Sequence, residues 1–157
     1  MIDIIEAKTP AEFAAGRTLI EEYASTLGLD LCFQNFGQEL STLLIMYGPP
    51  DGCLLRARTE GDFLGCVAIR RLDNQICEMK RLYLRREDRG SGLGRRLVEA
   101  ALEWTRRQRY RRMVLDTLPS MVAAQTLYKS LGFRRITPYY PNPIEGARYL
   151  ALDLATT

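Results

Sequence analysis

Apolar and polar residues follow two patterns along the chain, which predict strands and helices in succession. Short apolar runs bounded by turn residues indicate strands, and apolar residues at helical spacing indicate helices. Strands are expected at 2–5, 53–59, 63–72, 76–84, 113–117 and 149–154. Helices are expected at about 10–25, 37–47, 92–107 and 120–131. This succession predicts a three-layer α/β fold with a mixed sheet.

Local signals fix several of these boundaries. Thr9-Pro10-Ala11-Glu12 is a capping box with proline at the first helical position. Residues 48–52, Gly-Pro-Pro-Asp-Gly, end the second helix in a turn, and residues 60–62 connect two strands as a hairpin. In the helix at 92–107 the apolar residues share one face, which is expected to be buried.

The composition narrows the classes of function. The chain has 157 residues, 46% hydrophobic and 26% charged, and is expected to form one globular domain over 1–157 without repeats or linkers. It contains no histidine, the commonest general base and metal ligand near neutral pH. Ser-His-Asp triads, Cys-His pairs and histidine-bearing zinc sites are therefore excluded. The four cysteines form no CxxC motif, and we expect no metal.

The cysteines and the apolar runs also predict where the protein resides. Cys32, Cys53, Cys66 and Cys77 are expected to be small buried hydrophobic residues in a reducing cytosol. No basic segment leads into an apolar run after Met1, and no stretch approaches the ~18 apolar residues of a membrane span. We therefore expect a cytoplasmic protein with no membrane partner.

Positive charge is concentrated in one part of the chain. Residues 80–112 contain twelve basic and four acidic residues, so this window carries +8 and the remainder −5, against +3 overall. For 106–112 a solvated helix face with Arg-Glu pairs is favoured, whereas the glycines interleaved in 85–96 favour an anionic ligand. Nucleic acid is disfavoured because stacking aromatic residues are missing from the window and the rest of the chain is acidic.

The glycine-rich turn 89–94, Arg-Gly-Ser-Gly-Leu-Gly, lies between a predicted strand and a predicted helix. Residues without side chains let several backbone N–H groups converge on a phosphate, and a helix N-terminus adds a favourable partial charge. A dinucleotide GxGxxG motif fails because Arg95 stands at the third glycine, and the Gly-Lys-Ser/Thr of a Walker A loop is missing. An Arg-x-x-Gly-x-Gly pattern remains.

This pattern resembles the acetyl-coenzyme A motif of the GNAT superfamily of N-acetyltransferases. A second motif follows at the family's spacing: residues 127–133, Leu-Tyr-Lys-Ser-Leu-Gly-Phe, are similar to the tyrosine-bearing helix that ends in Gly-Phe. Residues 77–84 and 139–143 extend the resemblance, over nearly the whole chain, to small single-domain bacterial members. The resemblance implies a mostly antiparallel central sheet with helices on both faces and acetyl-CoA as the cofactor.

The resemblance also implies which residues bind the cofactor. Leu82–Leu84 would bind the pantetheine through the backbone, and the loop from Arg89 to Arg95 would bind the pyrophosphate. Many relatives carry asparagine at the position of Met121, a side chain that often bonds the cofactor, and Ser120 is the residue here that would replace this contact. The expected cofactor-binding residues are Leu82, Tyr83, Leu84, Arg89, Gly90, Ser91, Gly92, Leu93, Gly94, Arg95 and Ser120.

Two catalytic residues are implied in the same way. Tyr128 stands where relatives place the hydroxyl that protonates the coenzyme A sulfur. A phenol with a pKa near ~10 suits a thiol near ~8.5, because the proton stays on the tyrosine until the sulfur acquires charge. The alternative is a tyrosine that only packs in the core.

Glu78 occupies a position where some relatives keep a catalytic glutamate, and it would deprotonate the acceptor amine directly or through water. The alternative is an ion pair with Lys80 or a nearby arginine. Because strand residues two apart share a face, Glu78, Lys80, Leu82 and Leu84 are expected to point the same way. No histidine activates a cysteine, so direct attack by the amine is expected.

Two segments that mix aromatic rings with an amide are candidates for an acceptor pocket. They are 33–36 and 139–143, and surface loop packing is the alternative for both. The candidate substrate-binding residues are Gln34, Phe36, Tyr139, Tyr140 and Asn142. They do not distinguish an amino acid, a polyamine, an aminoglycoside or a protein terminus.

The favoured function is acetyl-CoA-dependent transfer of an acetyl group to a primary amine of a small molecule. The alternatives are a coenzyme A-binding sensor without turnover, a protein or peptide amine acetyltransferase, and a basic nucleic-acid-binding domain. The loop glycines favour coenzyme A over nucleic acid, and Tyr128 with Glu78 favours an enzyme over a sensor. A homodimer is left open.

Overall fold

The structure is a computed structural model that describes residues 1–27, 36–142 and 144–154. Its strands are β1 (Asp3–Glu6), β2 (Cys53–Thr59), β3 (Asp62–Arg71), β4 (Ile76–Leu84), β5 (Arg112–Thr117), β6 (Arg134–Ile136) and β7 (Arg148–Asp153). Its helices are α1 (Pro10–Leu27), α2 (Phe36–Ser41), α3 (Leu43–Met46), α4 (Leu93–Arg107) and α5 (Val122–Ser130), with a 3₁₀ turn at Arg86–Asp88. Within the described residues, no helix has the length and apolar character needed to cross a membrane.

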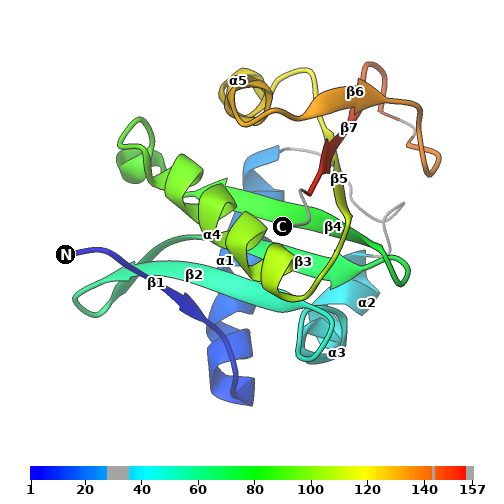
Figure 1. Cartoon of the computed structure of the whole chain (residues 1–157). Coiled ribbons are helices and arrows are strands. Elements are labelled where there is room, and N and C mark those ends of the chain that lie inside the picture. The colour runs from blue at the N-terminus through cyan, green and yellow to red at the C-terminus, as the bar shows by residue number, and fades with distance from the viewer. Residues whose placement is uncertain (28–35, 143, 155–157) are drawn as a thin grey trace.

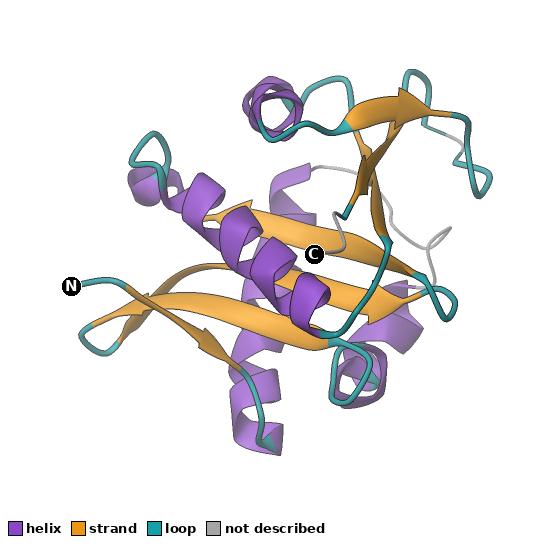
Figure 2. Ribbon diagram, viewed as in Figure 1, coloured by secondary structure: helices purple, strands orange, loops and turns teal. Residues whose placement is uncertain are grey.

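The strands form one seven-stranded sheet in the order β1-β2-β3-β4-β5-β7-β6. Neighbouring strands are antiparallel except β4 and β5, which are parallel. Helix α4 crosses one face of the sheet, and α1 lies on the other face (Figures 1 and 2). The expected α/β fold, with a mixed, mostly antiparallel sheet and helices on both faces, is confirmed.

Apolar side chains form a separate core on each face of the sheet. Leu97 and Ala101 of α4 belong to the first core, which also receives Tyr128 of α5. Phe13 and Ile20 of α1 belong to the second. The expected buried face of the helix at 92–107 is thus confirmed, and the sheet is covered by apolar helix faces on both sides.

The capping box of α1 is confirmed. Thr9 Oγ1 accepts the Glu12 N–H at 3.2 Å, and Glu12 Oε1 accepts the Thr9 N–H at 3.0 Å. Hydrogen bonds from Thr9 to its carboxylate are the main reason that the pKa of Glu12 is lowered. The chain therefore enters α1 at the residue that the sequence indicated.

Two element predictions were incomplete. The helix expected at 37–47 is divided at Thr42, which has φ −128° and ψ 28° and is not helical. The Thr42 hydroxyl donates to the Gln38 carbonyl at 2.7 Å, a local bond of the kind that competes with helix geometry. Strand β6 was missed because its three residues, Arg134–Ile136, are too few and too polar to form an apolar run.

Strand β4 contains a β-bulge where it pairs with β3. Cys66 pairs with Tyr83 and Ala68 pairs with Lys80, so one residue of β3 faces two residues of β4. The first of these two, Arg81, has a φ of 59°, in the left-handed region that residues with a Cβ rarely adopt. A bulge adds one residue to a strand and changes which face the following side chains occupy.

The expectation that Glu78, Lys80, Leu82 and Leu84 share a face is therefore wrong. Leu82 and Leu84 pack against the core beneath α4, together with Met79. Glu78 and Lys80 alternate with Met79 along the strand and so point to the opposite face. The bulge reverses the alternation, so Leu82 and Leu84 face the core beneath α4, whereas Glu78 and Lys80, which precede the bulge, point to the face that α1 and α2 cover.

Strands β4 and β5 are paired only near their beginnings. The ladder joins Ile76–Glu78 of β4 to Arg112–Val114 of β5. Beyond it, along Met79–Leu84, the edge of β4 toward β5 has no ladder partner among the described strands. The two strands diverge in Figure 1, and we call the opening between them the fork. Backbone N–H and C=O groups at the fork are available to a ligand.

Arg81 and Glu39 form a buried ion pair beside the bulge. Arg81 Nε donates to Glu39 Oε2 at 2.9 Å and Arg81 Nη2 to Oε1 at 2.7 Å, with exposed fractions of 7% and 2% for the two residues. Burial alone would raise the pKa of Glu39, but the hydrogen bonds and charge of Arg81 outweigh it and the pKa is lowered. The pair ties the left-handed residue of β4 to helix α2.

We predict that Glu39→Ala destabilises the fold by about 3–5 kcal/mol, because it leaves the Arg81 guanidinium buried without its carboxylate. Glu103→Ala is the matched control, since Glu103 pairs with Arg107 on the surface, and it should change the free energy of unfolding by less than about 0.5 kcal/mol. Urea denaturation measures both. Because the pKa of Glu39 is lowered, its contribution is complete at neutral pH and is lost as the pH falls through that pKa. Equal effects of the two substitutions would contradict the prediction.

Candidate active site

A groove of about 490 Å³ runs from the end of β4 to the start of α5, and we call it the β4–α5 groove. It has the size of a small-molecule site. Its walls come from α1, the end of β4, the glycine loop and the first turns of α5. The lining residues are Tyr23, Thr26, Leu82, Tyr83, Leu84, Arg89, Gly90, Gly94, Ser120, Met121, Val122, Ala123, Ala124 and Leu127.

A smaller cavity of about 60 Å³ adjoins this groove inside the fork, and we call it the fork cavity. Tyr23, Leu82, Met121 and Ala124 line both spaces, so the groove leads into the cavity. The remaining lining residues of the cavity are Met79, Lys80, Arg81, Asp116, Thr117, Leu118, Tyr128 and Ile144. A volume near that of two water molecules admits only the reacting end of an acceptor.

The N-terminus of α4 lies beside the groove without a capping side chain. Gly92 is the N-cap residue with φ 83°, and no side-chain hydrogen bond caps the helix. The first bond within the helix is from the Arg96 N–H to the Gly92 carbonyl, so the N–H groups of the first turn point out of the helix end. A Cβ at Gly90 or Gly92 would meet nothing within 4 Å, so the space beside the loop is open.

Most of the expected cofactor-binding residues line the same groove. They are Leu82, Tyr83, Leu84, Arg89, Gly90, Gly94 and Ser120. The side chains of Ser91, Leu93 and Arg95 are engaged elsewhere: Ser91 donates to the Asp88 carbonyl, Leu93 is buried in the core, and Arg95 pairs with Glu99. None of these three residues lines the groove, and neither does Gly92.

Tyr128 lines the fork cavity from α5. Its side chain is 6% exposed and packs on Phe133 at 5.6 Å between ring centroids. Among the described residues its hydroxyl has no hydrogen-bond partner. Burial raises the pKa of Tyr128, so the hydroxyl keeps its proton at neutral pH. The cavity thus has an uncommitted O–H donor on its wall.

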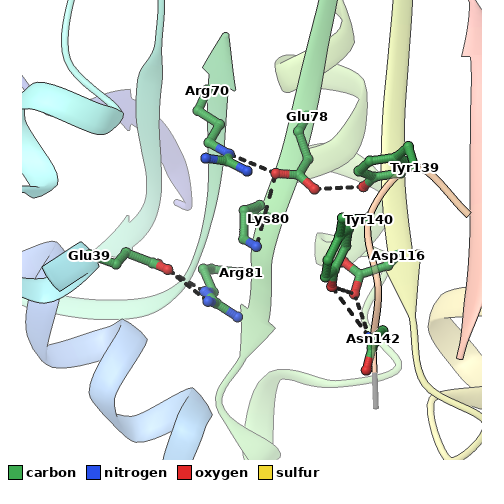
Figure 3. Close-up of polar contacts among 9 residues, drawn as sticks. All are labelled: Glu39, Arg70, Glu78, Lys80, Arg81, Asp116, Tyr139, Tyr140 and Asn142. Carbon is green, nitrogen blue, oxygen red and sulfur yellow. Dashed lines mark hydrogen bonds and ion pairs between the residues drawn. The ribbon is translucent and has the colours of Figure 1, made fainter. Parts of the chain in front are cut away.

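Glu78 is fully buried behind the cavity wall and does not line the cavity. Its Oε1 accepts from Arg70 Nε at 2.7 Å, and its Oε2 accepts from the Tyr139 hydroxyl at 2.6 Å (Figure 3). Lys80 Nζ lies 3.9 Å from Oε1. The ion pair that sequence reasoning gave as the alternative is therefore present, and a role as base would have to act through Lys80 or a water molecule.

The sequence analysis missed Asp116, the carboxylate that does line the cavity. Its Oδ2 accepts the Tyr140 hydroxyl in a short hydrogen bond and Asn142 Nδ2 at 3.1 Å (Figure 3). The missed signal was visible: Asp116 follows the apolar run Met113–Leu115 in β5, where a charged side chain is unusual unless it is paired or functional.

The four expected acceptor residues that the structure describes do not line the fork cavity. Tyr140 and Asn142 hold Asp116, and Tyr139 holds Glu78. The Phe36 ring lies 5.3 Å from Arg81 Cζ. The fifth expected residue, Gln34, lies outside the described residues.

Met121 lies where the groove meets the cavity. Its sulfur accepts from the Tyr23 hydroxyl at 4.0 Å and from Thr117 Oγ1 at 3.7 Å. Burial raises the pKa of Tyr23 to about 12, so this second phenol is also protonated at neutral pH. Met121 thus fills its position by packing and weak sulfur contacts.

Comparison with known proteins gives the family. The model of the acetyltransferase (GNAT) family matches residues 17–133. An uncharacterized N-acetyltransferase of Schizosaccharomyces pombe is 43% identical over 156 residues, which cover 98% of this chain and 96% of that protein. The chain belongs to the GNAT family. It is accordingly an acetyltransferase, as the resemblance of its motifs implied.

Solved structures of the GNAT fold are similar over the whole length. An acetyltransferase from Streptococcus agalactiae has a TM-score of 0.80 at 21% identity, with 98% of each chain covered. A GNAT family acetyltransferase from Elizabethkingia anophelis with acetyl-CoA bound has a TM-score of 0.66 at 20% identity, again with 98% of each chain covered. At these identities the similarity concerns the fold.

Proposed function

We propose that this GNAT protein transfers the acetyl group of acetyl-CoA to a primary amine of a small molecule, and that the amine attacks directly. The observation that supports this function is the fork cavity, which adjoins the β4–α5 groove and is lined by both Tyr128 and Asp116. An acetyl transfer to an amine requires one group that takes a proton from nitrogen and one that gives a proton to sulfur. This cavity has one of each.

The groove has the features that a coenzyme A pyrophosphate and pantetheine require. Gly90 and Gly92 have positive φ angles and no Cβ, and the first-turn N–H groups of α4 point outward. The edge of β4 at Leu82–Leu84 has no ladder partner among the described strands and offers backbone groups for pantetheine, although the Leu84 carbonyl accepts a hydrogen bond from Arg89 Nε at 3.1 Å. Acetyl-CoA would supply an activated acetyl thioester here, and Arg89 would add a positive charge beside the phosphates.

Tyr128 is the proposed acid. The sulfur of the leaving thiolate gains one proton, and the Tyr128 hydroxyl, which has no other partner in the described part of the chain, supplies it. The raised pKa of Tyr128 suits a donor, because the proton leaves only when negative charge develops nearby. The ammonium form of the acceptor loses two protons: the carboxylate base takes one before the attack and passes it to solvent, and the tyrosinate takes the second from the nitrogen of the tetrahedral intermediate, so the proton balance closes.

The carboxylates available as the base are Asp116, on the cavity wall, and Glu78, behind Lys80. Glu78 was expected from the family resemblance, and Asp116 is favoured by its place in the cavity. A cysteine nucleophile is disfavoured, because burial raises the pKa of Cys66 and of Cys77 to about 12. Thiols with such pKa values are unreactive at neutral pH, which supports direct attack by the amine.

The first test concerns the glycine loop. Gly92→Asp should weaken acetyl-CoA binding by ~100-fold or more, because its carboxylate would face the pyrophosphate and its Cβ would obstruct the backbone. Gly61→Asp is the matched control, since Gly61 also has a positive φ, 72°, and open space around it, but lies in the β2–β3 turn. Calorimetry measures both. Equal acetyl-CoA affinities of the two variants would show that the glycine loop does not bind the cofactor.

The second test separates the acid role of Tyr128 from packing. Tyr128→Phe keeps the ring and removes the donor, so kcat should fall by ~10²-fold or more while acetyl-CoA affinity changes little. Tyr110→Phe is the control: Tyr110 is also 6% exposed, and its hydroxyl donates to the Asp51 carbonyl, away from the cavity. Single-turnover rates give the chemical step. An unchanged single-turnover rate for Tyr128→Phe would show that Tyr128 only packs in the core and does not act as the acid.

The third test assigns the base by pH dependence. The base must be ionised in the free enzyme, so its removal should abolish the ascending limb of kcat/KM against pH. We expect this for Asp116→Asn, with the greatest loss below the pKa of the acceptor amine. Glu78→Gln should remove the same limb only if Glu78 acts through Lys80 or water, and otherwise should lower stability and leave the profile's shape intact. If the pH profile is unchanged in both variants, neither Asp116 nor Glu78 is the base.

A further inference from the structure

The charged residues on the wall of the fork cavity are Lys80, Arg81 and Asp116. The Arg81 side chain donates two hydrogen bonds to the carboxylate of Glu39 in α2. Lys80 and Asp116 therefore determine the charge that a ligand meets, one cation from β4 and one anion from β5. Figure 3 shows Lys80 beside β4, below the Glu78 carboxylate, and Asp116 between β4 and β5. A cavity this small with one charge of each sign suits a ligand that itself carries both.

Among the described residues, Lys80 shares its one counterion, Glu78, with Arg70. Its side chain is 8% exposed, and the nearest carboxylate oxygen, Glu78 Oε1, is 3.9 Å away. Arg70 Nε occupies that same oxygen at 2.7 Å, so Arg70 and Lys80 share one negative charge. Burial lowers the pKa of Lys80, because the shared carboxylate does not fully compensate for the loss of solvent around the ammonium group. A ligand anion at Lys80 would supply the missing charge.

Asp116 is a carboxylate that lacks a positively charged partner among the described residues. Its two hydrogen bonds come from Tyr140 and Asn142, which are neutral, and both reach Oδ2. Within the described residues Oδ1 receives no hydrogen bond, and no cation lies within ion-pair distance of Asp116. A ligand ammonium at Oδ1 would be both a hydrogen-bond donor and a counterion.

We propose that the acceptor is an α-amino acid, bound with its carboxylate at Lys80 and its amino group at Asp116. This inference rests on the proposed function and specifies the acceptor of the same site. A cavity of about 60 Å³ admits an amino group and a carboxylate only where they are close together, as on one carbon atom. The acceptor nitrogen then lies at the carboxylate that removes its proton.

The same charges disfavour the other amines that the sequence left open. A polyamine or an aminoglycoside would bring further positive charge against Lys80 and Arg81. A protein terminus has the amine, but an amide stands in place of the carboxylate, so Lys80 would stay without an anion. The discriminating chemical group is therefore the α-carboxylate.

The experiment compares each of the twenty amino acids with its own α-carboxamide, with acetyl-CoA as the donor and thiol release as the measurement. At least one amino acid should be acetylated with a kcat/KM ~30-fold or more above that of its carboxamide. Lys80→Met should abolish this preference, because it should lower kcat/KM for the amino acid far more than for the carboxamide. Lys80→Arg should restore part of the preference. Lys129→Met, at an exposed lysine of α5, is the control and should behave as wild type.

Melting temperatures establish that each variant is folded. Spermidine and a peptide with a free N-terminal amine are tested as two further acceptors. Faster turnover of spermidine or of the carboxamides would overturn the amino-acid inference and leave the small-amine function standing. Turnover of the peptide alone would overturn both. An amino-acid preference that survives in Lys80→Met would overturn the assignment of Lys80.

Discussion

The buried ion pair between Arg81 and Glu39 is the interaction on which the site depends. It fixes a left-handed residue in the middle of β4, where an ordinary strand residue would continue the pleat. The resulting bulge sends Lys80 to one face and Leu82 to the other, and it coincides with the divergence of β4 from β5. The groove, the unpaired backbone of β4 and the charged wall of the cavity all lie along this part of the strand.

The face of the sheet beneath α1 and α2 is organised by successive arginine–carboxylate pairs. Arg85 pairs with Glu22 of α1, Arg81 with Glu39 of α2, and Arg70 with Glu78 of the adjacent strand. Each guanidinium is thereby neutralised and held in place. Among the described residues at the fork, Lys80 shares the Glu78 carboxylate with Arg70 and Asp116 has no cationic partner, and unbalanced charges of this kind concentrate at functional sites.

The sequence was sufficient for the parts of the fold that follow from local rules. The capping box at Thr9, the amphipathic helix α4 and the positive-φ glycines of the loop were all predictable, because each depends on neighbours in the chain. The bulge at Arg81 was not predictable from the sequence, because it depends on Glu39, which lies 42 residues away in the chain. Without the bulge, simple alternation assigned Glu78 and Leu82 to one face.

The candidate site was predictable to a similar extent. The groove residues and Tyr128 follow from motifs, whereas Asp116 and Lys80 become neighbours only through the parallel pairing of β4 with β5. Sequence reasoning selected Tyr139, Tyr140 and Asn142 for an acceptor pocket. They contact the acidic residues Glu78 and Asp116, so the predicted residues lie near the fork cavity but are not the side chains on its wall.

The uncapped N-terminus of α4 has a consequence for the protein's stability in the cell. The glycine loop and the first turn of α4 are suited to the pyrophosphate, which is identical in acetyl-CoA and in free coenzyme A. A ligand that binds only the folded state stabilises it by about 2.7 kcal/mol at roughly a hundredfold excess over Kd. The folded population would therefore follow the total coenzyme A pool, whereas turnover would follow only its acetylated fraction.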